Sequence, residues 1–371
     1  MLQQPQPIYK LNEKLLDDTI KNNIDKITYI DWSEISNIEE VIHIFEKNVN
    51  KNIWYGALKY IDNPSVLEKY LDKLDINGWK ILCKNINAVN IIEKNLHKLN
   101  NECWMELCMN INAVSLIEKH LDKLTTRCFV LLAHNINAVH IIEQHLDKLD
   151  EDEYGWSILS GNINAVHVIE QHLDKLNNKG WHELAANINA VHIIENNLDK
   201  LDDNGWMGLA TNINAVHIIE QHIDKLTCPR HWINLCMNIN AAHIIEKHFD
   251  KLDDLDLNFL CQNKNAFYII EKNFDKLGYK QWGKLALTTD NMDILEKIMD
   301  KFDTRLWDAL ASNINAVHII EKNLNKLSGD GWYGLFTNPN AIHILQKNMD
   351  KLNIYAVLSN KNLVKLFSNL D

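Results

Sequence analysis

The sequence predicts an all-α fold, an α-solenoid of stacked two-helix repeats, on three observations. A glutamate or glutamine recurs at steps of 25 residues along most of the chain, as from Glu195 to Glu220. A second marker, usually tryptophan, keeps the same phase, as at Trp181 and Trp206. The composition is 46% hydrophobic with only 5 Pro and 12 Gly, which disfavours disorder and a β-rich fold. Because so short a unit cannot bury its apolar surface alone, we expect about twelve stacked units of about 25 residues each.

Three segments follow from the extent of this period. Residues 1–40 do not fit the repeat but carry helical periodicity, which predicts an N-terminal helical cap. Residues 41–352 form the α-solenoid repeats, and residues 353–371 resemble a truncated C-terminal repeat that acts as a second cap. The step lengthens from 25 to 27 residues across residues 151–161.

Each unit divides into two predicted helices, as residues 203–226 illustrate. A short first helix covers Asp203–Asn212, with Trp206 on its apolar face. We expect Asn212 to end this helix in the left-handed conformation that asparagine tolerates. Asn214 is then suited to cap the second helix, which is predicted to run from Ala215 to Lys225.

Two polar rows follow the second helices. Winding at 100° per residue places the apolar residues on one broad arc and His217 opposite, so we expect an exposed histidine row paired with the glutamate three residues on, here Glu220. A metal-binding or pH-sensing role is the alternative, but stacked helices roughly 8–10 Å apart hold neighbouring imidazoles too far apart to share one zinc ion. A second row alternates His and Asn, as at His222 and Asn197, and is predicted to bond loop carbonyls of the neighbouring unit.

The recurring tryptophans are predicted to be core anchors, because each lies three residues before an apolar residue on the same helix face. These structural residues are Trp79, Trp104, Trp156, Trp181, Trp206, Trp232, Trp282, Trp307 and Trp332. The seven cysteines mostly adjoin core positions as small apolar residues would, and we interpret them as reduced thiols of an intracellular protein.

The first helices vary more between units than the second helices do. Positions after each tryptophan change freely, and we predict that they form a protein-binding surface, with neutral drift as the alternative. This predicted surface comprises Lys80, Met105, Glu106, Ser157, His182, Glu183, Met207, Ile233, Asn234, Asp308 and Tyr333. Positions just before the loop also vary, namely Lys84, Met109, His134, Gly161, Thr211, Met237 and Gln262.

The sequence also disfavours several classes of function. A nucleophile beside a base, a glycine-rich phosphate loop and a residue cluster that breaks the repeat are all missing, so we predict no catalytic residues, cofactor or metal. The net charge of −12 argues against a general grip on nucleic acid. The chain lacks an apolar run long enough to span a bilayer, so no membrane association is expected.

The phrases NPNAIHILQKNMDKL at 338–352 and NINAVHIIEKNLNKL at 313–327 resemble the Asn-rich helical repeats of giant viruses of the mimivirus type. The resemblance covers roughly residues 40–360, nearly the whole chain. It implies a viral protein made in the host cell cytoplasm, including the virus factory or the virion, with a host-interaction or virion-associated role.

Together these observations favour a non-enzymatic protein-binding scaffold or adaptor whose partner is an unidentified protein. One alternative is a self-assembling or virion-associated structural protein, because near-identical second helices can pack against their own copies. A second alternative, modular RNA binding with one base per unit, is disfavoured by the acidic balance and by the lack of a repeating Arg or Lys at the variable sites.

Overall fold

The computed structural model describes residues 55, 58–61, 63–348 and 351, so the predicted caps at 1–40 and 353–371 lie outside the described residues. The described part of the chain is helical and contains no strand. It divides into two compact units. Unit 2 is Ile92–Leu285, and unit 1 comprises the described residues before and after it. None of the described helices is both long and apolar enough to cross a membrane.

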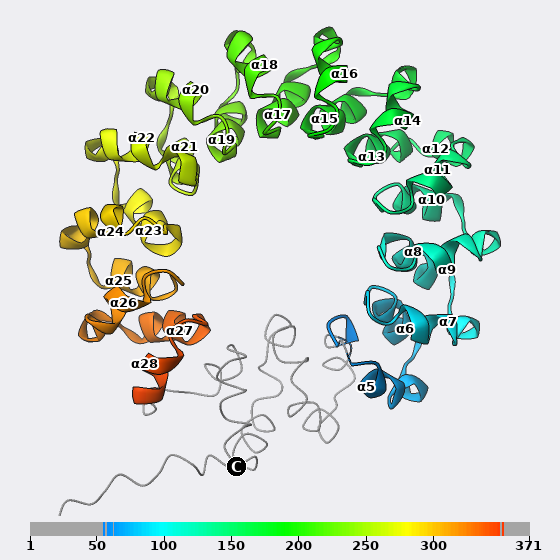
Figure 1. Cartoon of the computed structure of the whole chain (residues 1–371), viewed down its shortest axis with the longest axis horizontal. Helices are drawn as coiled ribbons and strands as arrows, with labels where there is room; N and C mark the ends of the chain where they lie inside the picture. The colour runs from blue at the N-terminus through cyan, green and yellow to red at the C-terminus, as the bar shows by residue number, and fades with distance from the viewer. Residues whose placement is uncertain (1–54, 56–57, 62, 349–350, 352–371) are drawn as a thin grey trace, which may run out of the picture. The chain divides into compact units, whose positions relative to one another are not determined.

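Unit 2 repeats a longer first helix, a short second helix and one turn of 3-10 helix. Figure 1 shows the first helices and the second helices of this unit as two separate rows. The first helices are α8 (Asn101–Met109), α10 (Thr126–Leu132), α13 (Gly155–Gly161), α15 (Asn178–Ala186), α17 (Asp203–Thr211), α19 (Pro229–Met237), α21 (Asp254–Leu260) and α23 (Tyr279–Thr288), which continues into unit 1.

The second row of unit 2 is built from shorter elements. Its α-helices are α9 (Val114–Glu118), α11 (Val139–Glu143), α14 (Val166–Glu170), α16 (Val191–Glu195), α18 (Val216–Gln221), α20 (Ala242–Lys247) and α22 (Phe267–Lys272). The 3-10 turns are η3 (Leu96–Lys98), η4 (Leu121–Lys123), η5 (Leu173–Lys175), η6 (Leu198–Lys200), η7 (Ile223–Lys225), η8 (Phe249–Lys251), η9 (Lys264–Ala266) and η10 (Phe274–Lys276). One α-helix, α12 (Asp147–Asp150), takes the place of a 3-10 turn between α11 and α13.

Unit 1 repeats the same pattern in both of its segments. The earlier segment contains α5 (Pro64–Glu68), η2 (Leu71–Lys73), α6 (Ile76–Leu82) and α7 (Val89–Glu93), which continues into unit 2. The later segment contains α24 (Met292–Ile298), η11 (Met299–Lys301), α25 (Thr304–Ala311), α26 (Val317–Glu321), η12 (Leu324–Lys326), α27 (Gly329–Thr337) and α28 (Ile342–Lys347).

The core confirms the predicted solenoid, because successive first helices pack on one another, from α8 to α21 in unit 2 and at α25 and α27 in unit 1. In unit 2, α15 contacts α13 on one side and α17 on the other. The predicted tryptophan anchors are buried except Trp282 and Trp332, which are half-buried. Ile218 and Ile219 of α18 are buried as well, and burying each such side chain contributes roughly 1.5–3 kcal/mol. The seven cysteines are free thiols, and all but Cys228 are buried.

The second helix is shorter than predicted. Where a continuous helix from Ala215 to Lys225 was expected, α18 ends at Gln221, and His222 has φ −127° and ψ 37° before the turn η7 begins. The equivalent Asn197 shows the physical reason, since its side-chain Nδ2 donates to the Ile193 carbonyl at 2.8 Å. A side chain that bonds its own main chain in this way competes with continuation of the helix.

The loop between the helices also differs from the prediction. Asn212 is extended, with φ −76° and ψ 110°, and no described residue, glycine included, has a positive φ. The Asn212 Oδ1 accepts a bond from the Asn214 main-chain N–H at 3.0 Å, which closes the loop without a left-handed residue. The residue at the N-cap of α18 is Ala215, not Asn214, and it makes no side-chain capping bond.

The buried asparagines of these loops join each repeat to the preceding one. The Asn212 Nδ2 donates to the carbonyls of Ala185 and Asn187, both at 2.9 Å, and these carbonyls lie at the C-terminal end of α15, where helices leave acceptors unpaired. Asn212 is 0% exposed, so its three bonds replace those that water would make. The same bonding recurs at Asn135, Asn162, Asn187, Asn238 and Asn263 in unit 2 and at Asn313 and Asn338 in unit 1. We refer to these residues as the asparagine ladder.

Candidate functional site

Part of the predicted protein-binding surface lies between repeats. The Ser157 Oγ donates to the Asn177 Oδ1 at 2.9 Å, and the Asn177 side chain caps the next first helix, α15. Asp308 accepts bonds from the N–H of Ser328 at 2.9 Å and from its hydroxyl at 2.5 Å, at the N-cap of α27. Ser157 is only 1% exposed, so the prediction that it contributes to an accessible surface is wrong.

Two further residues of that predicted surface contact neighbouring repeats through main-chain carbonyls. A ring nitrogen of His182 bonds the Asn204 carbonyl at 2.6 Å, in the following repeat. The Asn234 Nδ2 donates to the Met207 carbonyl at 3.0 Å, in the preceding repeat. The remaining members divide by burial, with Lys80, Met105, Glu106, Glu183, Met207 and Ile233 half-buried and Tyr333 exposed.

A different set of first-helix positions faces outward. They are the second residue before each aromatic marker and the fifth after it, which helical spacing places on one face. On α15 these positions are Lys179, which is exposed, and Ala186, which is half-buried. We call the corresponding residues of all the first helices, together with the loop residue that follows each ladder asparagine, the open face.

The loop residue of the open face is usually an exposed isoleucine. It lies between the two asparagines of each loop, and its side chain is left outside the core. In unit 2 the exposed members are Ile111, Ile136, Ile163, Ile188 and Ile239. A row of exposed apolar side chains at a fixed interval is typical of an interaction surface.

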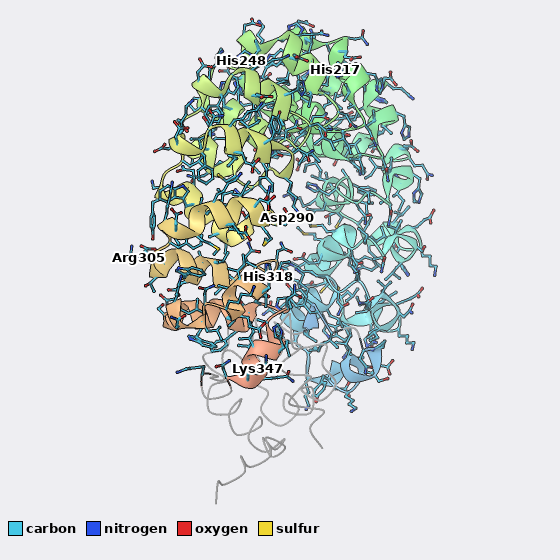
Figure 2. The ribbon with its side chains drawn as sticks, turned by 60° about the vertical axis from the view of Figure 1, so that its left-hand side comes forward. His217, His248, Asp290, Arg305, His318 and Lys347 are labelled. Carbon is cyan, nitrogen blue, oxygen red and sulfur yellow. The ribbon has the colours of Figure 1, made fainter. Side chains whose placement is uncertain are left out.

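Cations recur at the first position of the open face. They are the second residues of their helices, namely Arg127, Lys179, Arg230 and Lys280 in unit 2 and Arg305 in unit 1. Figure 2 shows Arg305, which is exposed, at the margin of the view. The helix dipole favours negative charge in the first turn, so these cations do not serve helix stability. They also contrast with the net charge of −12 of the whole chain.

A cavity of about 530 Å³ opens on this face of unit 2, where α10, α13 and α15 meet. Its apolar lining comes from Ile136, Ile158 and Ile163. Its polar lining includes Arg127, His134, Tyr154, Lys179 and Glu183. The cavity therefore combines apolar walls with charged groups of both signs.

The cavity lies where the repeat is two residues longer. Helix α12 replaces the usual 3-10 turn there, and Tyr154 is left 43% exposed at the start of α13. Gly161 ends α13 without a side chain, whereas α8 and α19 end with the exposed Met109 and Met237. A Cβ built on Gly161 would lie 3.4 Å from the Glu183 Oε2, so a larger residue would fill the cavity.

The charges of the cavity are partly paired. The Arg127 guanidinium lies 3.5 Å from the Asp152 carboxylate, and the Lys179 ammonium lies 4.7 Å from the centre of the Tyr154 ring. Burial lowers the pKa of His134, and the positive charges of Lys179 and Arg127 lower it further, while Glu183 opposes the shift. The described residues contain no group of three His, Cys, Asp or Glu side chains placed to hold a metal ion.

The exposed histidine row of the second helices pairs differently from the prediction. The His217 Nε2 lies 2.6 Å from Glu195 of the preceding repeat, not from Glu220 of its own helix. His243 likewise lies 3.4 Å from Glu220, which also accepts a bond from Lys247. The Lys247 bond lowers the pKa of Glu220, with His243 as a weaker contributor. The row therefore links repeats to one another.

The second His/Asn row bonds its own repeat, so the predicted bonds to loop carbonyls of the neighbouring unit are wrong. A ring nitrogen of His172 bonds the Val168 carbonyl at 2.8 Å, four residues earlier. The His172 ring also lies 5.0 Å from the Trp156 ring, centre to centre, and His222 lies 5.8 Å from the Trp206 ring. These contacts hold the second helix against its own first helix.

Comparisons of the chain with protein-family models, with curated proteins and with solved structures found no match. The structure is thus that of a regular helical-repeat protein whose successive repeats are joined by buried asparagines.

Proposed function

We propose that this chain is a non-enzymatic protein-binding scaffold that binds its partner through the open face. The observation that carries the proposal is the exposed isoleucine row beside cations that the helix dipole disfavours. Neither feature contributes to the buried core or to the asparagine ladder, so stability of the fold does not account for them.

The variation between repeats supports the same binding surface. The last position of the open face carries Met109, His134, Gly161, Thr211 and Met237 in successive or nearby first helices of unit 2, and all five are exposed. A constant frame that presents a different side chain in each repeat is how solenoids build extended binding surfaces. Binding through many such contacts of modest strength gives specificity by complementarity along the whole row.

The resemblance to giant-virus repeats adds the finer part of the proposal. On that basis the chain is a viral protein in the host cell cytoplasm, and its partner is a host protein. The support is the repeat phrase alone, as at 338–352.

Affinity purification from infected cells, followed by mass spectrometry, tests the proposal. The wild-type chain is compared with an open-face double variant, Arg230→Glu with Met237→Ser, and with a matched second-row variant, His217→Ala with Glu195→Gln. We expect the open-face variant to lose a partner that the second-row variant retains. Retention by the open-face variant together with loss by the second-row variant would place binding on the other row.

Self-assembly is the second candidate, because the exposed isoleucine row could pack against its copy in another chain. Size-exclusion chromatography with light scattering distinguishes the two functions. A monomer at micromolar concentration is expected for a scaffold, whereas a concentration-dependent oligomer that Ile188→Ser and Ile239→Ser dissolve would favour assembly.

A further inference from the structure

We propose that the cavity between α10, α13 and α15 anchors an acidic, extended segment of the partner protein that inserts one apolar side chain of leucine size. This inference rests on the proposed protein-binding function and specifies its main contact. The volume of about 530 Å³ falls within the range of roughly 300–1,000 Å³ typical of ligand sites, and it exceeds what one trapped water would occupy.

The apolar wall of the cavity favours binding of an apolar side chain. Ile136 and Ile163 are 40% and 39% exposed, Ile158 is half-buried, and Tyr154 presents an exposed ring. These four side chains belong to two successive repeats and converge on one hollow. A leucine, isoleucine or methionine inserted there would cover all of them at once, which an isolated surface isoleucine elsewhere on the open face does not offer.

The charged side of the cavity favours an acidic segment. Arg127 and Lys179 lie in its lining, from the helices on either side of α13, against the single carboxylate of Glu183. His134 also faces the cavity, and Asp152 pairs with Arg127 from outside the lining. The Lys179 ammonium lies over the face of the Tyr154 ring and makes no ion pair within the described residues, so a carboxylate can approach it without displacing one.

The cations beyond the cavity extend the same preference. Arg230 and Lys280 occupy the position equivalent to Lys179 on α19 and α23 of the same unit. A segment that continues along the open face past α17, where the equivalent residue is Asn204, therefore meets further positive charge at α19. Toward α8 it meets Glu102 and Glu106 instead, which gives the segment a preferred direction of extension.

The size of the segment follows from the spacing of helices. Three packed helices at roughly 10 Å intervals span roughly 30 Å, and an extended chain covers about 3.3 Å per residue, so about nine residues suffice to cross α10, α13 and α15.

A random peptide library of about nine residues, displayed on phage and selected against the intact chain, tests the inference. We expect the selected peptides to be rich in Asp and Glu and to share one Leu, Ile or Met. Fluorescence polarisation of these peptides should show a loss of affinity of roughly tenfold or more for Gly161→Met, which fills the cavity, and for Lys179→Glu.

Matched variants separate the cavity from the rest of the open face. Thr211→Met places the same side chain at the equivalent position of α17, and Lys280→Glu reverses the equivalent charge on α23; both should leave peptide affinity unchanged. Circular dichroism checks that each variant is folded. Lys179→Glu, a substitution of an exposed residue, keeps the test decisive where Gly161→Met does not fold.

Three results would overturn the inference: no enrichment of acidic peptides, equal binding by Gly161→Met and Lys179→Glu, or stronger binding of a single-stranded oligouridine than of any selected peptide. The last result would assign the cations to nucleic acid. If the partner purified from cells still depends on Arg230 and Met237 while the cavity variants have no effect, only the inference fails. If partner binding is independent of the open face, the proposed function fails as well.

Discussion

Two links between helices of unit 2 show how the repeat accommodates change. In the regular link before α17, the turn η6 is followed by Asp202, whose carboxylate accepts a bond from the Gly205 N–H at 2.9 Å. In the longer link before α13, helix α12 replaces the turn, and the Asp150 carboxylate bonds the Trp156 indole N–H at 2.8 Å. The N-cap residue there, Tyr154, makes no side-chain capping bond.

The difference teaches that insertions alter the links and leave the frame unchanged. Asn162 follows the longer link but still donates to the carbonyls of Ala133 and Asn135, as Asn187 does to its own preceding repeat. The extra residues are absorbed before α13, where Tyr154 and the adjoining cavity face outward. New surface therefore arises without loss of the contacts that hold the repeats together.

The largest expected effect concerns the common frame. Asn187→Leu and Asn162→Leu should each lower the free energy of unfolding by about 1.5–4.5 kcal/mol, because each removes a buried side chain that makes three hydrogen bonds, at about 0.5–1.5 kcal/mol each. Urea denaturation measures the loss, and hydrogen exchange shows whether it is confined to the flanking repeats.

Asn189→Ala is the control, since it removes only the exposed bond from the Asn189 side chain to the Ile163 carbonyl, and that loss should cost below about 1 kcal/mol. A much smaller cost for Asn162→Leu than for Asn187→Leu would mean that the longer link has weakened the frame.

A smaller effect distinguishes the two links. A Cβ on Gly155 would lie 2.7 Å from the Leu149 carbonyl oxygen and 2.9 Å from its Cα, so Gly155→Ala forces the main chain to move, at about 1–3 kcal/mol. A Cβ on the equivalent Gly180 meets side chains and no main-chain atom, with Leu176 at 3.2 Å and Asn177 Oδ1 at 3.7 Å, and the gain in helix propensity of about 0.5–1 kcal/mol offsets much of the closer contact. Thermal denaturation of the two variants should rank Gly155→Ala clearly below Gly180→Ala; the reverse order would contradict the description of the longer link.

The exposed histidine row should be insensitive to the type of link. His167 pairs with Glu143 across the longer link and His217 pairs with Glu195 across a regular one, and both pairs are exposed. His167→Ala and His217→Ala should each change the free energy of unfolding by less than about 0.5 kcal/mol, as expected of surface sites. A large drop in melting temperature for either variant would show that the row supports the stack more than its exposure indicates.

The smallest effect is a pH dependence at Glu220. Its pKa lies below the ordinary 4.5 because Lys247 bonds the carboxylate, so the stabilisation is present above pH 4.5 and is lost as the pH falls through the lower folded value. Lys247→Ala should raise the pKa of Glu220 toward 4.5, although His243 retains part of the shift. NMR titration of the side-chain carboxyl carbon measures this, and an unchanged pKa in the variant would exclude the Lys247 bond as its main cause.

The sequence predicted the stack and most of its core because period and apolar phase are properties of the chain itself. It placed the first helix at Asp203–Asn212, and the structure has it at Asp203–Thr211. It overextended the second helix, because the bond from the Asn197 side chain to the Ile193 carbonyl leaves no trace in the hydrophobic pattern.

The open face was harder to predict because it depends on distances between repeats. The positions of Ser157 and Asp308 vary between repeats, as positions in a binding surface do, yet each of these two residues contacts the N-cap of the next first helix. Variation at such a position reflects matching to a neighbour as well as to a partner. The 27-residue step is visible in the sequence. The hollow beside it could not be predicted, because it depends on how closely Glu183 of the following repeat approaches Gly161.

The asparagine ladder also makes the repeats interchangeable. Each ladder side chain reaches only main-chain carbonyls, as Asn238 does at Ala210 and Asn212, and every residue type carries that acceptor. The ladder bonds of a repeat therefore depend on the main-chain position of the preceding repeat and not on its sequence. Duplication or deletion of a whole repeat within the gene preserves the ladder bonds at the new junction, so the chain can be lengthened or shortened, and its surface reordered, without compensating substitutions in the ladder.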